Sequence, residues 1–106
     1  MANNALQLPE LCLTRADGEA VRRQIESLLD SMPSSDRLTI DFSSTTTMAP
    51  AFADECLGKL ATKLGAAELR RRISLQNADP TLRILVNAVL YDRLAPPSPQ
   101  PAANRS

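Results

Sequence analysis

The residues best placed for chemistry follow a strand-like segment in the middle of the chain. Asp41 comes near the end of the apolar run 38–42, and five consecutive hydroxyl residues, 43–47, come next. If the run is a strand of a parallel sheet, Asp41 lies at its carboxyl edge, where α/β proteins collect ligands. The carboxylate could contact a ligand or accept a phosphate, or it could accept hydrogen bonds from loop N–H groups. We favour the structural role, and we favour a plain polar connection over a phosphorylation segment for residues 43–47.

A pair of adjacent acids, Asp54 and Glu55, could suggest general acid–base catalysis. Both fall in a helix that Pro50 can open at its first position. Neighbouring side chains on a helix diverge by about 100°, so the two carboxylates cannot face one substrate together. Acidic residues also suit a first turn, and Lys59 is spaced to pair with Glu55 on the surface. The pair therefore predicts a solvated helix face and no catalytic role.

The composition excludes several classes of enzyme. The chain has no histidine and three glycines, which rules out a Ser-His-Asp or Cys-His nucleophile, a histidine zinc site and glycine-rich phosphate loops. The two cysteines, Cys12 and Cys56, are too few for a secreted disulfide scaffold, and we expect them to be small buried hydrophobes. We predict no enzymatic activity, no cofactor and no metal site.

The charge pattern does not favour nucleic acid as a partner. Twelve Lys and Arg balance twelve Asp and Glu, and the one dense basic run is 70–72. A nucleic-acid site usually has more positive charge, and it has more aromatic residues for base stacking than this chain, which has three. We interpret the run first as a solvated helix end and second as a rim for an acidic protein partner.

Length and proline content divide the chain into one domain and a tail. The 106 residues, 43% of them hydrophobic, allow a single domain, which we place at 5–94. The segment 95–106 holds four of the eight prolines, and we expect it to be flexible or polyproline-like. No signal-peptide pattern or membrane-length apolar run occurs, so we predict a cytoplasmic protein that does not contact membranes.

Hydrophobic periodicity predicts alternating strands and helices. Period-two or β-branched segments at 6–8, 11–14, 38–42 and 72–76 predict strands. Asp17-Gly18 is a turn and cap signal before the first helix, and Gly65 ends the second. Apolar residues at helical spacing predict three helices, each with one apolar face. The three faces consist of Val21, Ile25, Leu28 and Leu29; of Ala53, Cys56, Leu57, Leu60, Ala61 and Leu64; and of Leu82, Leu85, Val86, Val89 and Leu90. The order predicts an α/β fold, with a mostly parallel sheet of about four strands covered by three helices.

One stretch resembles a known family. Residues 39–43 read Thr-Ile-Asp-Phe-Ser, and residues 48–60 read Met-Ala-Pro-Ala-Phe-Ala-Asp-Glu-Cys-Leu-Gly-Lys-Leu. The stretch is similar to STAS-like domains, which include anti-sigma factor antagonists and cytosolic domains of sulfate transporters. It resembles most closely the bacterial STAS-like group of unknown function, and the likeness covers most of 11–94. The resemblance implies a small STAS-like sandwich.

The resemblance also implies a function. It suggests a non-enzymatic bacterial regulatory adaptor that, like an anti-sigma factor antagonist, binds a histidine-kinase-like ATPase. In such antagonists the partner phosphorylates a Ser or Thr at the start of the helix after the central strand. Ala51 stands at that place here, so the nearest candidate is Thr47. The expected partner-binding residues are Asp41, Ser43, Ser44, Thr47, Pro50, Ala51, Phe52 and Asp54. The alternative is a phosphate- or nucleotide-sensing module, and a small enzyme is a third possibility.

The last predicted helix carries a second apolar strip. Ile84 and Tyr91 lie roughly opposite its core-facing residues. Scattered surface apolar residues are normal. A strip of this kind can nevertheless mark self-association, so we also consider a homodimer or a partner contact there.

Overall fold

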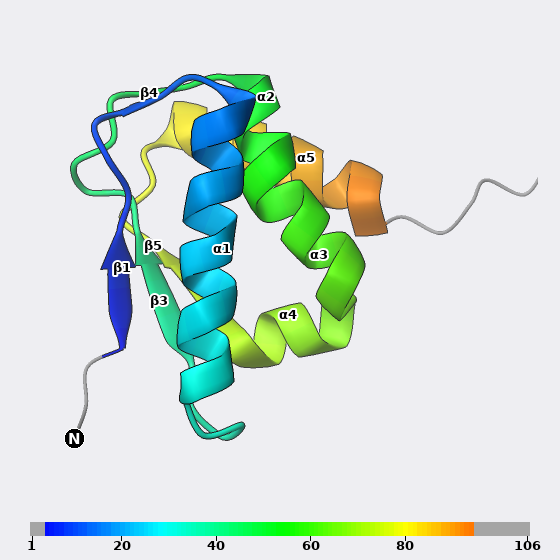
Figure 1. The fold of residues 1–106 in the computed structure, drawn as a ribbon. Coiled ribbons are helices and arrows are strands. Elements are labelled where there is room, and N and C mark those ends of the chain that lie inside the picture. Colours follow the sequence, from blue (N-terminus) through cyan, green and yellow to red (C-terminus); the bar gives the residue numbers. More distant parts are fainter. Residues whose placement is uncertain (1–3, 95–106) are drawn as a thin grey trace, which may run out of the picture.

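The computed structural model describes residues 4–94, and the predicted tail 95–106 lies outside this part of the chain. Figure 1 shows the order of elements along the ribbon. They are β1 (Ala5–Gln7), β2 (Leu11–Cys12), α1 (Arg15–Ser31), β3 (Leu38–Asp41), β4 (Thr47–Met48), α2 (Pro50–Ala53), a π-helical turn η1 (Asp54–Gly58), α3 (Lys59–Leu64), α4 (Ala66–Arg72), β5 (Ile73–Gln76) and α5 (Pro80–Leu94). The elements α2, η1 and α3 follow one another without a break, and we call them together the central helix.

The strands pair in parallel, as predicted. Three form a sheet in the order β1-β3-β5, and β2 pairs with β4 in a separate short ladder. The α/β fold class is confirmed, with three plus two strands where the sequence suggested about four in one sheet. The described part of the chain also has one more helix than predicted, because α4 follows Gly65 directly.

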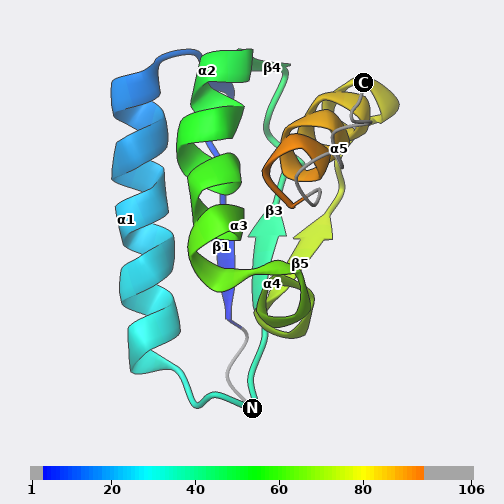
Figure 2. The ribbon, with the colours of Figure 1, turned by 90° about the vertical axis from the view of Figure 1, so that its right-hand side faces the viewer.

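The helices pack on one face of the three-stranded sheet. The register aligns Leu6, Ile40 and Leu75 in one row, and these side chains belong to the core or pack against it. The next row, Gln7, Asp41 and Gln76, points to the other face. Figure 1 shows the strands on the left with the helices to their right, and Figure 2 shows α1, α3 and α5 side by side. The carboxyl ends of all three strands therefore meet at one edge, next to β4 and the start of the central helix.

The central helix is the most buried element. It lies between α1 and α5, and Phe52, Cys56 and Leu60 are completely buried. A side chain at Gly18 of α1 would come within 2.8 Å of the Phe52 carbonyl oxygen, so α1 can approach only where it has no Cβ. The two helices are thus in close backbone contact.

The start of the first helix differs from the sequence prediction. Helix α1 begins at Arg15 because the Thr14 hydroxyl accepts a hydrogen bond from the Asp17 N–H at 3.0 Å. Asp17-Gly18 is therefore inside the helix, and the turn predicted there is wrong: its glycine serves close packing.

Within residues 4–94, none of the helices has the length and apolar character needed to cross a membrane.

Candidate functional site

Asp41 organises the turn at the end of the central strand. Its Oδ1 accepts hydrogen bonds from Ser43 N at 2.9 Å and from Asn77 Nδ2 at 2.9 Å, and its Oδ2 accepts one from Ser43 Oγ at 3.1 Å. The Asn77 amide, followed by the Ser43 N–H, lowers the pKa of the Asp41 carboxyl below its usual value. The favoured structural role is confirmed: the carboxylate joins the loops that follow β3 and β5.

The hydroxyl loop, residues 43–47, is held by the segment between β1 and β2. Thr45 Oγ1 donates to the carbonyl oxygen of Pro9 at 2.9 Å, and Thr46 N donates to that of Glu10 at 2.9 Å. Gln7 Nε2 reaches Ser44 Oγ at 2.6 Å. Ser43, Ser44 and Thr47 are nevertheless exposed, so a fixed backbone presents their side chains to solvent.

The start of the central helix continues this exposed edge. Ala49 N donates to the Cys12 carbonyl at 2.8 Å, which fixes the entry of the chain into α2. Pro50 is exposed and Ala51 is half-buried. Phe52 is completely buried, so the prediction that it contacts a partner is wrong for its side chain. The aromatic ring belongs to the core because α2 packs between α1 and α5.

Asp54, the last predicted contact residue, is already paired within the domain. Its two carboxylate oxygens accept from Arg93 Nε at 2.9 Å and Nη2 at 2.8 Å, a bidentate arrangement. Arg15 Nη1 lies 3.5 Å from Oδ2. The hydrogen bond from Arg93 is the main reason that the pKa of Asp54 is lowered. Asp54 thus joins the central helix to α5.

Glu55 is the residue that the sequence interpretation misplaced most. We expected it on a solvated face, but it is only 5% exposed because α1 covers it. Its carboxylate lies 3.2 Å from Arg15 Nη1, 3.4 Å from Arg22 Nη2 and 3.0 Å from Lys59 Nζ. The predicted pair with Lys59 is confirmed, and the hydrogen bond from Lys59 is the main cause of a lowered pKa of Glu55.

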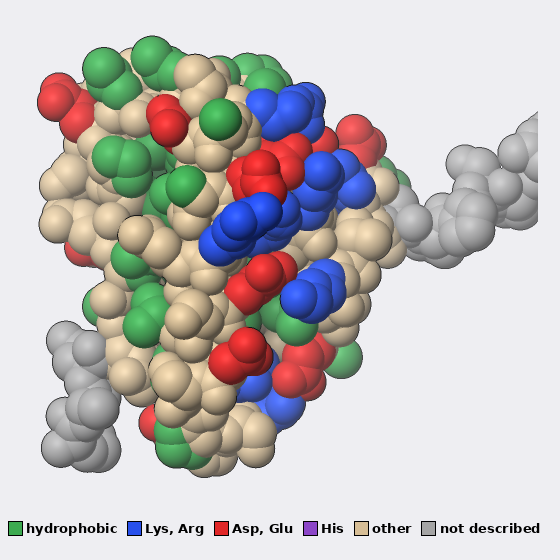
Figure 3. Space-filling model, viewed as in Figure 1, with side chains coloured by type: hydrophobic (Ala, Val, Ile, Leu, Met, Phe, Trp, Pro, Cys, Tyr) green, Lys and Arg blue, Asp and Glu red, His purple; other side chains and the backbone are tan. Residues whose placement is uncertain are grey.

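These side chains form one cluster, which we call the charged junction. It consists of Arg15, Arg22, Asp54, Glu55, Lys59 and Arg93. Figure 3 shows basic and acidic side chains in contact along a band that crosses the helices. The π-helical turn holds Asp54 and Glu55, and such turns frequently occur at functional sites. The sequence pattern signals only the pair of Glu55 with Lys59 one turn later, because the arginines of the junction come from α1 and α5, far away in the chain.

The chemistry available at these places is contact and charge pairing. A glutamate with a lowered pKa and three cationic partners is a poor base. Both cysteines are completely buried, and burial raises the pKa of the Cys56 thiol to about 12, so neither thiol is a ready nucleophile. The prediction that Cys12 and Cys56 are buried hydrophobes is confirmed.

The remaining predicted sites lie elsewhere on the surface. Ile84 and Tyr91 of α5 are 72% and 74% exposed, which confirms their outward placement, whereas self-association stays a prediction. The basic run ends α4, as the helix-end interpretation requires. One member departs from it: Arg72 is buried and donates to the carbonyl oxygens of Asp36 and Leu29.

A parallel sheet covered by helices on one face, with an exposed loop–helix corner after its central strand, defines a STAS-like α/β domain. The family model described as a STAS-like domain of unknown function matches residues 17–83, and the chain belongs to that family. No curated protein and no solved structure matches the chain.

Proposed function

We propose that this protein is a non-enzymatic regulatory adaptor of bacterial signalling, acting in the cytoplasm and related in role to the anti-sigma factor antagonists. It binds a histidine-kinase-like ATPase through the docking edge, which we define as Asp41, Ser43, Ser44, Thr47, Pro50 and Ala51. One observation carries the proposal: hydrogen bonds fix the backbone of this edge on both sides while most of its side chains stay exposed.

The structure refines the contact set that the family resemblance suggested. Phe52 is buried and supports the edge from below, and Asp54 is engaged by Arg93. The surface left for a partner is uncharged apart from Asp41, with hydroxyl groups from the loop and apolar side chains from the start of the central helix. Such a surface suits a complementary protein contact, in which hydrogen bonds at the rim give specificity.

Covalent control at this edge would differ from the pattern of the antagonists. Ala51 has no hydroxyl, so the residue at the usual place cannot accept a phosphate. Thr47 is exposed and lies at the other end of the same corner, in β4. Phosphate there would add nearly two negative charges to a docking edge whose one charged residue, Asp41, is already negative, which opposes binding.

The direct test is site-specific photo-crosslinking in the host cell. A photoreactive amino acid at Pro50 samples the docking edge, and one at Gln24, exposed on α1, is the matched control. We expect the Pro50 variant to crosslink a histidine-kinase-like ATPase, identified by mass spectrometry, and the Gln24 variant to miss it. Equal crosslinking from both positions, or no ATPase from Pro50, would refute the proposed edge.

The same sample tests whether the partner phosphorylates the docking edge. Intact-mass measurement after incubation with the crosslinked ATPase and ATP reports any added phosphate. We expect one phosphate on the Ala51→Ser variant, since it restores the hydroxyl of the family. If the natural chain is also modified, Thr47→Ala should abolish that mass change; persistence of the change would exclude Thr47.

A specific hollow supports the alternative, a phosphate- or nucleotide-sensing module. It lies beside β5 and α5, and polar side chains of Gln76, Asn77, Arg83 and Asn87 line part of it. Arg83 has no ion pair with any residue of 4–94, so its charge is available to an anion. Under this alternative, ATP should raise the melting temperature in proportion to the logarithm of its concentration, and Arg83→Gln should remove the shift.

A further inference from the structure

Within residues 4–94, Arg70 is the unpaired member of the basic run that ends α4. Arg71 Nη2 lies 2.7 Å from Glu68 Oε2, and Arg72 Nη2 donates to the Leu29 carbonyl at 3.1 Å. The side chain of Arg70 is different: it has no hydrogen bond or ion pair with any residue in the described range. A permanently charged guanidinium is therefore free to receive an anion from outside the domain.

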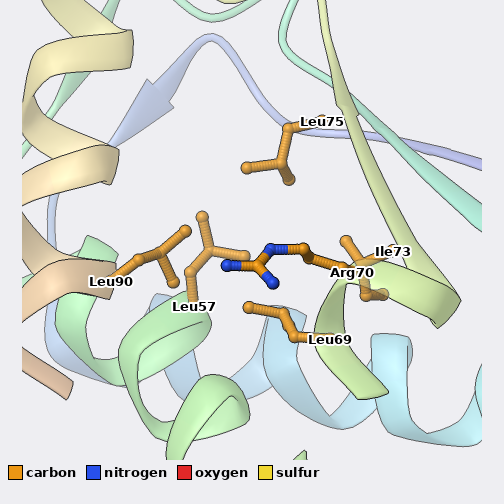
Figure 4. Close-up of a pocket in the computed structure, with 6 residues that line it drawn as sticks. All are labelled: Leu57, Leu69, Arg70, Ile73, Leu75 and Leu90. Atoms are coloured by element: carbon orange, nitrogen blue, oxygen red, sulfur yellow. The ribbon is translucent and has the colours of Figure 1, made fainter. Parts of the chain in front are cut away.

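The Arg70 guanidinium extends over an apolar hollow. Figure 4 shows it pointing toward Leu57, between the side chains of Leu69 and Leu75. The hollow has a volume of about 140 Å³, and its other lining residues are Ile73 and Leu90. An apolar protein cavity of about 150 Å³ can hold benzene, so this hollow has room for one leucine or phenyl side chain.

A second, more open hollow adjoins the first. The two share Leu69, Arg70 and Leu90, and the second adds Tyr91 and Leu94 from α5. Tyr91 is 74% exposed and stands at its rim. Together the two hollows form a groove between α4 and α5, with apolar walls and one unpaired cation above the place where the hollows meet.

This groove is separate from the docking edge. In both Figure 1 and Figure 2, α4 lies at the end of the molecule opposite β4 and the start of the central helix. None of the groove residues belongs to the docking edge. A ligand in the groove would therefore leave the edge free.

We propose that the α4–α5 groove binds a short amphipathic helix of a second protein partner. That helix carries two apolar side chains four residues apart and, three residues after the first of them, an acidic side chain on the same face. Side chains four residues apart on a helix are neighbours, so they can enter two adjoining hollows, as in other helix-in-groove complexes. The free Arg70 sets the required sign of the intervening charge, and the domain acts as a bridge between two proteins.

The test uses defined synthetic helices. The probe is a blocked alanine-based peptide with two leucines four residues apart and a glutamate three residues after the first leucine, on the same face. One control peptide has lysine in place of the glutamate, and another has alanines in place of the leucines. We expect the glutamate peptide to bind in isothermal titration and to shift the amide signals of Leu69, Arg70 and Leu90. The lysine peptide should bind about tenfold more weakly, and the alanine peptide not measurably.

Charge reversal tests the role assigned to Arg70. In Arg70→Glu the order of the peptides should invert, with the lysine peptide now the tighter ligand. Arg23→Glu makes the same change of charge on an exposed residue of α1 outside the groove, and it should leave the order unchanged. Because both positions are exposed, both variants should keep the fold.

Three outcomes would overturn the proposal. The first is no binding of the glutamate peptide, and the second is an order of affinities that Arg70→Glu does not change. The third is a dimer of the free protein that Tyr91→Glu dissociates, because a second copy would then be the occupant of the groove.

Discussion

The turn around Asp41 and the junction around Glu55 both depend on a carboxylate, but they use it differently. Asp41 accepts hydrogen bonds from nearby loops at the open end of the sheet. Glu55 is covered by α1 and paired with three cations, two of which come from another helix. The first carboxylate shapes a surface, whereas the second holds helices together.

The difference shows how burial changes the meaning of an acidic residue. Around Asp41, water can replace a lost hydrogen bond, so the free energy at risk is small. Around Glu55, loss of the carboxylate leaves cations of a covered interface without a counter-charge, which is costly. Arg22 makes this clear, because its Nε is buried and has no hydrogen-bond partner within residues 4–94 even when Glu55 is present.

The largest expected effect is that of Glu55→Ala. The free energy of unfolding should fall more than in any other single variant considered below, because Arg22 loses its carboxylate partner in a mostly covered position. Chemical denaturation at neutral pH measures the change. Glu19→Ala is the control, since within residues 4–94 Glu19 pairs only with the exposed Arg23, and it should stay close to the unmodified protein. Equal losses in the two variants would contradict a structural role of the junction.

The second prediction concerns the close contact beside the junction. A Cβ at Gly18 would lie 2.8 Å from the Phe52 carbonyl oxygen and 3.1 Å from Glu55 Cβ. Gly18→Ala should therefore cost about 1–3 kcal/mol by overpacking, although alanine is the better helix former. The midpoint of denaturant unfolding reports the loss. If Gly18→Ala instead stabilises the protein, α1 can move away from the central helix and the junction is not rigid.

Acid should weaken the junction before it weakens the core. The pKa of Glu55 is lowered from its ordinary value of 4.5, chiefly by Lys59, so the folded state favours the charged form. The resulting stability is present above 4.5 and is lost as the pH falls through the lower folded pKa. Thermal unfolding from neutral pH to below 4.5 should show this loss, and Glu55→Gln should make the melting temperature depend less on pH in that window. An identical pH profile in the variant would assign the loss to other carboxylates.

Sequence patterns predicted local features well and contacts between distant parts of the chain poorly. The strand at 38–42, the helix opened by Pro50 and the end of that helix at Gly65 all follow from patterns within a few residues, and all are confirmed. Helix α4 was missed because its apolar pattern is short. The covered Glu55 was missed because no local pattern distinguishes it from a solvated acid. Its environment comes from α1, 33 and 40 residues away in the chain for its two arginine partners.

The smallest effect on stability is expected for Asp41→Asn. Asparagine keeps an oxygen that can accept from the Ser43 N–H and the Asn77 amide, and the site is open to water. The free energy of unfolding should hardly change, whereas Asp41→Ala should speed hydrogen exchange at the Ser43 amide by removing its acceptor. If the edge docks a partner, Asp41→Ala should weaken that complex more than Asp41→Asn does, because only alanine releases the turn that presents Ser43 and Ser44. A fall in stability as large as that of Glu55→Ala would contradict the contrast between a carboxylate that shapes a surface and one that joins helices.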